Sequence, residues 1–235
     1  MPHRWCDSAE LRRKQIESGT DLTFNKVFKP IFIEKVLGLN REPILEVGAG
    51  TGHLSKELAA NGLRITAVEP STGMFKVAKE VLDGSGVELI NCLVDDLPEH
   101  IKYEVAISHL VAHVVNDSTR FFNSIANHLE VGGHFVFSIP HPCFFNGYKK
   151  IFGDHYCYME SAQKEISFTI TKDPNNVISG VPYHHRPLTS YISSLVSAGF
   201  AIDGFEETWP SYVVQKMYGE IWENPRYCVF ICKKL

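Results

Sequence analysis

The chain has 235 residues, of which 44% are hydrophobic and 21% are charged. A disordered chain would have fewer apolar residues and a larger net charge, so this composition excludes one. A chain of this length buries enough surface to fold as one large domain without disulfides or structural metals. The formal net charge of −4 disfavours a nucleic-acid partner, because such binding needs clustered Lys and Arg side chains that displace counterions from phosphates.

The cysteines and the N-terminus indicate a reduced, cytoplasmic setting. The six cysteines include no Cys-x-x-Cys pair and no spacing that would surround a zinc ion, so we predict no metal. The charged residues near the N-terminus are not followed by an apolar run, and we expect no signal peptide. No apolar stretch is long enough to cross a bilayer, and we therefore expect no membrane partner.

The N-terminal part of the chain is predicted to be helical. Residues 8–38 are typical of one or two helices, with a break near Gly19-Thr20-Asp21 and a bend at Pro30. We take residues 1–40 as a helical cap in front of the rest of the domain.

Segments with strand and helix periodicity alternate from residue 43 to residue 140, which is typical of a parallel sheet with helices on both faces. Asp117 or Ser118 is expected to begin the helix after the fourth strand, which would run to Leu129 and end at Gly132-Gly133. The predicted strands are largely apolar, as strands covered on both faces are: residues 43–47, 63–69, 87–92, 103–108 and 134–139.

The pattern changes after residue 140. Residues 141–186 form a long interruption with a weakly alternating run and a turn at Asp173-Pro174-Asn175-Asn176. Because loops of this length are usually functional, we predict a small lid or hairpin over a site. The C-terminal part, residues 187–235, is predicted to contain a helix over 188–198, with Tyr191, Ile192 and Leu195 inward, and strands over 200–206 and 226–232.

A glycine-rich turn follows the first predicted strand. Gly48 and Gly50 would let the backbone turn sharply against a ligand, and Gly52 would allow close approach where the next helix begins. The dinucleotide fingerprint requires a glycine at position 53, which is His53 here, so an NAD site is disfavoured. Glu46 places a carboxylate beside the turn and suits a ligand that carries an ammonium group.

The second predicted strand ends at Glu69, beside the same turn, where a carboxylate can accept both hydroxyls of a ribose. With these two motifs in order, residues 43 to about 140 resemble the class I S-adenosylmethionine-dependent methyltransferases, and the rest of the chain resembles them more loosely. The segments 138–144 and 185–188 resemble the branch that methylates small molecules. The resemblance implies an α/β fold with a three-layer, Rossmann-like, seven-stranded sheet, mostly parallel with an antiparallel last strand.

The resemblance also implies roles for individual residues. Glu46 would reach the amino group of S-adenosylmethionine, and Glu69 would hold its ribose. Where the family often has an Asp that meets the adenine, this chain has Leu93, with Asp95 and Asp96 two and three positions later. Either the loop shifts its register, or backbone groups of Leu93 and Val94 hold the adenine. The complete cofactor set is Glu46, Gly48, Gly50, Gly52, Glu69, Leu93, Val94, Asp95, Ser108 and His109.

Residues after the cofactor motifs are candidates for catalysis and acceptor binding. His141 follows the fifth strand beside the expected methyl position, where a neutral imidazole could act as a general base; the alternative is a loop histidine bonded to its neighbours. Arg186 could pair with an acidic acceptor or could fix the lid to the sheet. The candidate acceptor-binding residues are His113, Tyr183, His184, His185 and Arg186.

We therefore predict an enzyme that transfers a methyl group from S-adenosylmethionine to an O, N or C atom of a small molecule. Two alternatives remain open. One is a tRNA or rRNA methyltransferase, which the acidic balance and the few clustered Lys and Arg residues disfavour. The other is a protein that binds the cofactor without turnover, which a fold alone does not exclude.

Overall fold

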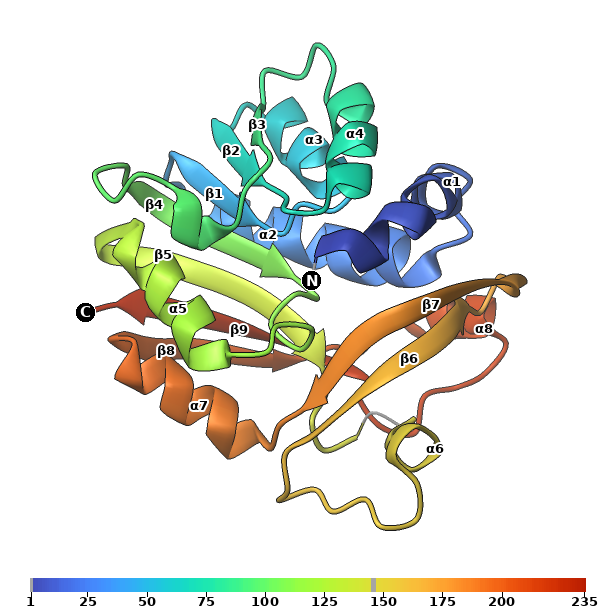
Figure 1. The fold of residues 1–235 in the computed structure, drawn as a ribbon. Helices are drawn as coiled ribbons and strands as arrows, with labels where there is room; N and C mark the ends of the chain where they lie inside the picture. The colour runs from blue at the N-terminus through green and yellow to red at the C-terminus, as the bar shows by residue number, and fades with distance from the viewer. Residues whose placement is uncertain (1, 145–146) are drawn as a thin grey trace.

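The computed structural model describes residues 2–144 and 147–235; residues 1, 145 and 146, which belong to the predicted cap and lid, lie outside the described part. Its centre is a seven-stranded sheet with the order β3-β2-β1-β4-β5-β9-β8 (Figure 1). Among the described strands of this sheet, β9 alone runs antiparallel to the others, which confirms the predicted fold class. The strands are β1 Ile44–Val47, β2 Ile65–Val68, β3 Glu88–Ile90, β4 Tyr103–His109, β5 Leu129–Pro140, β8 Phe200–Glu207 and β9 Tyr227–Lys234.

Two apolar layers cover the faces of this sheet. Side chains alternate along β4, so that Val105 and Ile107 pack into one layer and Ala106 packs into the other. The first layer contains apolar residues of α2 and α3, and the second contains those of α5 and α7. The helices around the sheet are α2 Lys29–Leu39, α3 His53–Ala60, α4 Thr72–Val81, α5 Ser118–Asn127 and α7 Leu188–Ser197.

The ends of α5 differ partly from the prediction. Asp117 is the N-cap, since its carboxylate accepts a hydrogen bond of 2.9 Å from Arg120 N. The helix ends at Asn127, and Gly132-Gly133 lie inside β5, so the predicted glycine stop is wrong. A Cβ on Gly133 would lie 2.8 Å from Glu130 O, which shows that this glycine serves close backbone packing in the strand.

The N-terminal segment confirms the predicted break. It consists of η1 Pro2–Ser8, α1 Ala9–Glu17 and η2 Thr23–Phe28, and the chain turns at Gly19 with φ 76°. Pro30 lies in the first turn of α2, where a proline is tolerated without a bend. In α7, Tyr191 and Leu195 are buried as predicted, but Ile192 is 36% exposed.

The predicted lid contains a two-stranded hairpin of β6 Ala162–Ile170 and β7 Asp173–His185 (Figure 1). Its turn lies at residues 171–172, so residues 173–176 belong to the strand and not to the turn. Two helices were not predicted, α6 Tyr148–Phe152 and α8 Tyr212–Tyr218. Within the described residues, no helix combines the length and the apolar character that crossing a membrane requires.

Candidate active site

The glycine turn after β1, from Gly48 to Gly52, leaves the backbone of Gly50 uncovered. Gly48, Gly50 and Gly52 all have positive φ, at 75°, 57° and 79°. A Cβ on Gly48 would lie 2.5 Å from a methyl group of Val111, so the turn packs directly under the loop that follows β4. A Cβ on Gly50 would meet nothing within 4 Å. A ligand can therefore approach the backbone at Gly50.

Glu69 joins this turn to the end of β2. Its carboxylate accepts hydrogen bonds of 2.8 Å from the backbone N–H groups of Gly50 and Ser71, one at each oxygen. The side chain is 6% exposed, and burial raises its pKa to about 7. These two hydrogen bonds fix the Glu69 carboxylate, which is predicted to bind the ribose, beside the glycine turn.

Glu46 places a second buried carboxylate in β1. It is 2% exposed and accepts a hydrogen bond from the Ser55 hydroxyl of α3. Burial raises the pKa of Glu46 to about 7, and the negative charge of Glu69 contributes in the same direction. Two neighbouring buried acids make the ionised state costly in the free protein, and a cationic ligand would relieve that cost.

The loop after β3 forms a short turn, η3 Val94–Asp96. The carboxylate of Asp95 accepts hydrogen bonds from Ser124 and, at 3.1 Å, from Arg120, so it is directed toward α5. Asp96 accepts a hydrogen bond of 3.3 Å from Leu93 N. The Asp95 carboxylate and the Leu93 N–H group are thus both engaged within the protein, and the predicted adenine contacts of Leu93, Val94 and Asp95 stay predictions.

The end of β4 contributes one packing contact, from Ser108, and one partly buried histidine, His109. Ser108 is fully buried and donates a 2.9 Å hydrogen bond to Val47 O, which ties β4 to β1. His109 Nδ1 lies 2.8 Å from Ser138 Oγ. Burial lowers the pKa of His109 to about 3. Its ring contacts Phe28 at a centroid distance of 4.3 Å.

The N-terminal cap docks beside the predicted ribose site, which sequence reasoning missed. Cys6 lies 3.3 Å from Thr72 Oγ1 and accepts a 3.3 Å hydrogen bond from Gly73 N, at the start of α4. A Cβ on Gly73 would lie 2.4 Å from Cys6 Cα. This glycine inside a helix, two residues after Ser71, is the one sequence signal that could have indicated the contact.

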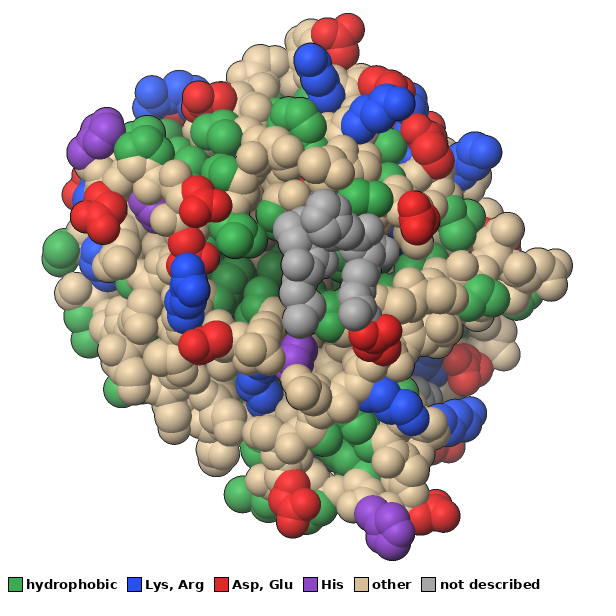
Figure 2. Space-filling model, viewed as in Figure 1, with side chains coloured by type: hydrophobic (Ala, Val, Ile, Leu, Met, Phe, Trp, Pro, Cys, Tyr) green, Lys and Arg blue, Asp and Glu red, His purple; other side chains and the backbone are tan. Residues whose placement is uncertain are grey.

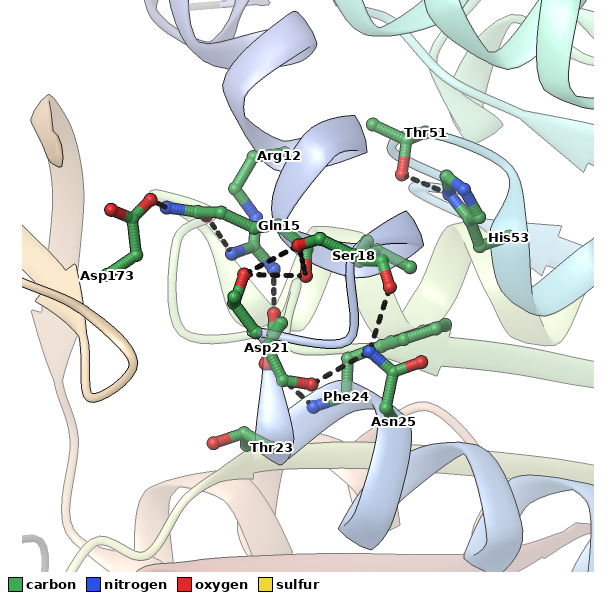
Figure 3. A network of polar contacts seen from close by, with 12 residues as sticks. Arg12, Gln15, Ser18, Asp21, Thr23, Phe24, Asn25, Thr51, His53 and Asp173 are labelled. Atoms are coloured by element: carbon green, nitrogen blue, oxygen red, sulfur yellow. Dashed lines mark hydrogen bonds and ion pairs between the residues drawn. The ribbon is translucent and has the colours of Figure 1, made fainter. Parts of the chain in front are cut away.

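A polar network connects the cap to the hairpin (Figure 3). The guanidinium of Arg12 donates to Gln15 Oε1 at 2.8 Å and to the buried carboxylate of Asp21. Gln15 then donates a hydrogen bond of 3.0 Å to Asp173 in β7. The network therefore holds the hairpin against the N-terminal cap.

Both ring nitrogens of His141 are engaged. Nδ1 accepts a 3.1 Å hydrogen bond from Cys143 N, and Nε2 lies 2.9 Å from Glu207. A proton acceptor at this position would first need one of these bonds to break. The contacts favour the loop-histidine alternative, and the general-base role of His141 stays a prediction.

The predicted acceptor-binding residues lie together at the base of the hairpin. Several of them already bond to other groups of the protein. Arg186 donates to backbone carbonyls of residues 112, 115 and 116 at 2.7–3.3 Å, so it fixes the loop after β4. His185 bonds to Tyr158 O at 2.9 Å. The His113 ring packs on Tyr183, at a centroid distance of 5.1 Å, and His113 O accepts a bond of 2.8 Å from His184 N.

Known proteins resemble this chain in sequence and in fold. Residues 45–137 match the family model described as a methyltransferase domain. The glycopeptide N-methyltransferase MtfA, solved in complex with S-adenosylmethionine, aligns with a TM-score of 0.60 over 86% of this chain and 85% of that chain, at 16% identity. Residues 45–137 therefore form a methyltransferase domain, and most of the chain shares the fold of solved S-adenosylmethionine-dependent methyltransferases. The predicted fold is thereby confirmed, and the predicted resemblance to the methyltransferases is confirmed over residues 45–137.

Two curated relatives each match a little under half of this chain. An uncharacterized methyltransferase of Oceanobacillus iheyensis is 29% identical over 114 residues, which are 46% of this chain and 54% of the relative. The malonyl-[acyl-carrier protein] O-methyltransferase of Acetivibrio thermocellus is 32% identical over 101 residues, which are 42% of this chain and 36% of the relative. The chain spans about half the length, or less, of these relatives.

Proposed function

We propose that the chain is an S-adenosylmethionine-dependent methyltransferase that acts on an O, N or C atom of a small-molecule acceptor. The observation that carries the proposal is the pair of buried carboxylates, Glu46 and Glu69, around the open backbone of Gly50. Each acid has a raised pKa and no cationic side-chain partner among the described residues. A ligand with an ammonium group and a ribose fits this donor set.

The residues of the turn would hold the cofactor. Glu69 would accept the ribose hydroxyls, Glu46 would reach the ammonium group, and the Gly50 backbone would lie against the amino-acid end. When bound, S-adenosylmethionine supplies a methyl group on a positively charged sulfur. Most of the catalysis then consists of alignment and exclusion of water, which the cap and the hairpin can provide.

The acceptor would lie between the N-terminal cap, the hairpin and the loop after β4. This placement rests on the network from Arg12 to Asp173 and on the packing of His113 against Tyr183. Lys and Arg side chains are interspersed with Asp and Glu side chains on the described part of the face in Figure 2, which favours a small molecule over a nucleic acid.

Parallel calorimetric titrations with S-adenosylmethionine, S-adenosylhomocysteine and NAD test the cofactor. We expect heat from the first two only. Binding of NAD in their place would contradict the proposal. Transfer of isotopically labelled methyl groups to a small-molecule extract would then distinguish an enzyme from a protein that only binds the cofactor.

A further inference from the structure

The junction between β4 and its following loop has an uncommon backbone conformation. Leu110 has φ 54°, in the left-handed region that branched side chains rarely adopt. In this conformation Leu110 N donates to Ser138 O at 3.1 Å and to Ser138 Oγ at 3.2 Å. Such strain persists where the surroundings fix it, and it is concentrated at functional sites.

The same serine determines the tautomer of His109. Ser138 is fully buried, and its hydroxyl oxygen accepts the Leu110 N–H. Among the described contacts, the only acceptor for the hydroxyl hydrogen is His109 Nδ1, at 2.8 Å. Because burial keeps the pKa of His109 near 3, the ring is neutral at pH 7. Its one ring hydrogen is therefore on Nε2.

The Nε2–H group of His109 is not used by any hydrogen bond of the described residues. It has no hydrogen-bond partner among the described residues, and the residue is only partly buried. Among the described residues, the fully buried side-chain nitrogens that make no hydrogen bond are His53 Nε2, His113 Nδ1, His134 Nδ1, His185 Nδ1 and Trp222 Nε1. His109 Nε2 is not one of them, and His109 as a residue is partly exposed.

The surroundings leave this donor in a largely apolar setting. The rings of Phe24, Phe28 and Phe32 lie at centroid distances of 6.0, 4.3 and 5.6 Å from the His109 ring. The nearby charges of Asp21 and Arg12 are bonded to each other. A hydrogen bond to an oxygen is strong in such a place, because little water competes for the donor.

We propose that His109 is a recognition residue whose Nε2–H group binds a carboxylate oxygen of a bound molecule, and that Ser138 is the positioning residue that holds this tautomer. The inference rests on the proposed function, because it places the donor at the cofactor edge of the sheet. The carboxylate belongs either to the amino-acid end of the cofactor or to the acceptor molecule. A neutral donor accommodates the anion without acting as a base.

Nitrogen-detected NMR of protein with 15N-labelled histidine tests the proposal, with the His109 signals assigned from a His109→Gln variant. We expect the proton on Nε2 in the free protein, and loss of the fixed tautomer in Ser138→Ala. S-adenosylhomocysteine should shift the Nε2–H signal while 5′-methylthioadenosine, which lacks the carboxylate, should not. If the carboxylate belongs to the acceptor, benzoate should shift the signal and benzyl alcohol should not.

Affinity measurements complete the test. His109→Phe keeps a ring among the phenylalanines and should weaken binding of the molecule that shifted the signal by about tenfold. His109→Gln keeps a donor and should retain most of the affinity, and His134→Gln, at a histidine near Asp203, is the control that should leave binding unchanged. A proton on Nδ1, or an Nε2–H signal unmoved by all four compounds, would overturn the proposal. Failure of S-adenosylhomocysteine to bind at all would instead contradict the proposed function, while the tautomer and benzoate results would still decide the role of His109.

Discussion

The side-chain amide of Gln15 donates a hydrogen bond of 3.0 Å to Asp173 Oδ2, and this contact joins two residues that are 158 positions apart. Gln15 is 2% exposed, and its carbonyl oxygen accepts from Arg12. The N-terminal cap and the tip of the hairpin are thus linked through a buried polar group. Such groups are costly to leave unpaired, so the contact should control whether the two segments stay together.

Gln15→Glu should separate the hairpin from the cap, because two carboxylates would face each other at hydrogen-bond distance. We expect faster amide hydrogen exchange in β6 and β7 and a loss of about 1–3 kcal/mol in stability. The double variant Gln15→Glu, Asp173→Asn restores a donor opposite an acceptor and should recover the protection. Unchanged exchange in the single variant would show that the contact does not hold the hairpin.

Gly73→Ala should displace the N-terminal cap, because the added methyl group would overlap the backbone of Cys6. We expect the affinity for S-adenosylhomocysteine to fall by about tenfold, as ordering the displaced cap becomes part of binding. Gly38→Ala is the matched control: this helical glycine has open space around it, and alanine there should stabilise the protein by up to about 1 kcal/mol. Equal affinities of the two variants would contradict the docking role of Gly73.

Glu46 and Glu69 should make the stability of the free protein depend on pH. Their pKa values are raised from 4.5 to about 7, so between these pH values the folded protein keeps protons that the unfolded chain has lost. The free energy of unfolding should therefore fall as pH rises from 4.5 to 7, by on the order of 3 kcal/mol for each acid. Glu46→Gln should remove about half of this slope in chemical unfolding experiments.

The affinity for the cofactor should show the opposite trend. An ammonium group favours ionised Glu46, so affinity should rise with pH until the pKa of about 7 and then level off. In Glu46→Gln the affinity should be lower and less dependent on pH. A calorimetric affinity of the natural protein that is constant from pH 5.5 to 8 would contradict this role.

Glu69→Ala should weaken binding of S-adenosylmethionine by about 1.5–3 kcal/mol, the range for hydrogen bonds to a charged group. The structure adds a second consequence, since the variant also leaves the N–H groups of Gly50 and Ser71 without their acceptor. Glu69→Gln keeps one acceptor oxygen and should be intermediate in thermal stability. Calorimetry that gives the same affinity for Glu69→Ala and the natural protein would rule out the ribose assignment.

His141→Ala tests the two roles that remain for this residue. Because both ring nitrogens are bonded, we expect a loss of about 1–3 kcal/mol in stability and turnover that stays within about tenfold of the natural rate. Thermal unfolding and labelled methyl transfer measure the two quantities. Turnover reduced by about two to four orders of magnitude at unchanged stability would instead identify His141 as the general base.

The sheet could be predicted from sequence because apolar strands and glycine turns are local signals. The turn at Gly48 to Gly52 and the cap at Asp117 are set by residues within a few positions of each other. The glycine pair at 132–133 misled the helix prediction, because glycine also serves close packing inside a strand. The helix α8 was missed because its exposed apolar residues, such as Val213 at 70%, give no clear one-sided pattern.

The site could be predicted only in part, because sequence patterns report local structure and not the contacts between distant segments. Glu46 and Glu69 follow adjacent strands of a parallel sheet, so their proximity follows from topology. The contacts of Cys6 with α4 and of Gln15 with Asp173 join distant segments, and nothing local in either segment specifies the partner. The engagement of His141 by Glu207 likewise depends on the pairing of β5 with β9 and of β9 with β8.

A crystal structure of the chain with S-adenosylhomocysteine tests the central claim most directly. We predict the nucleoside across the carboxyl ends of β1 and β2, with both ribose hydroxyls on Glu69 and the amino group toward Glu46. A nucleoside bound elsewhere, with neither acid in contact with it and the Gly50 backbone uncovered, would contradict the account.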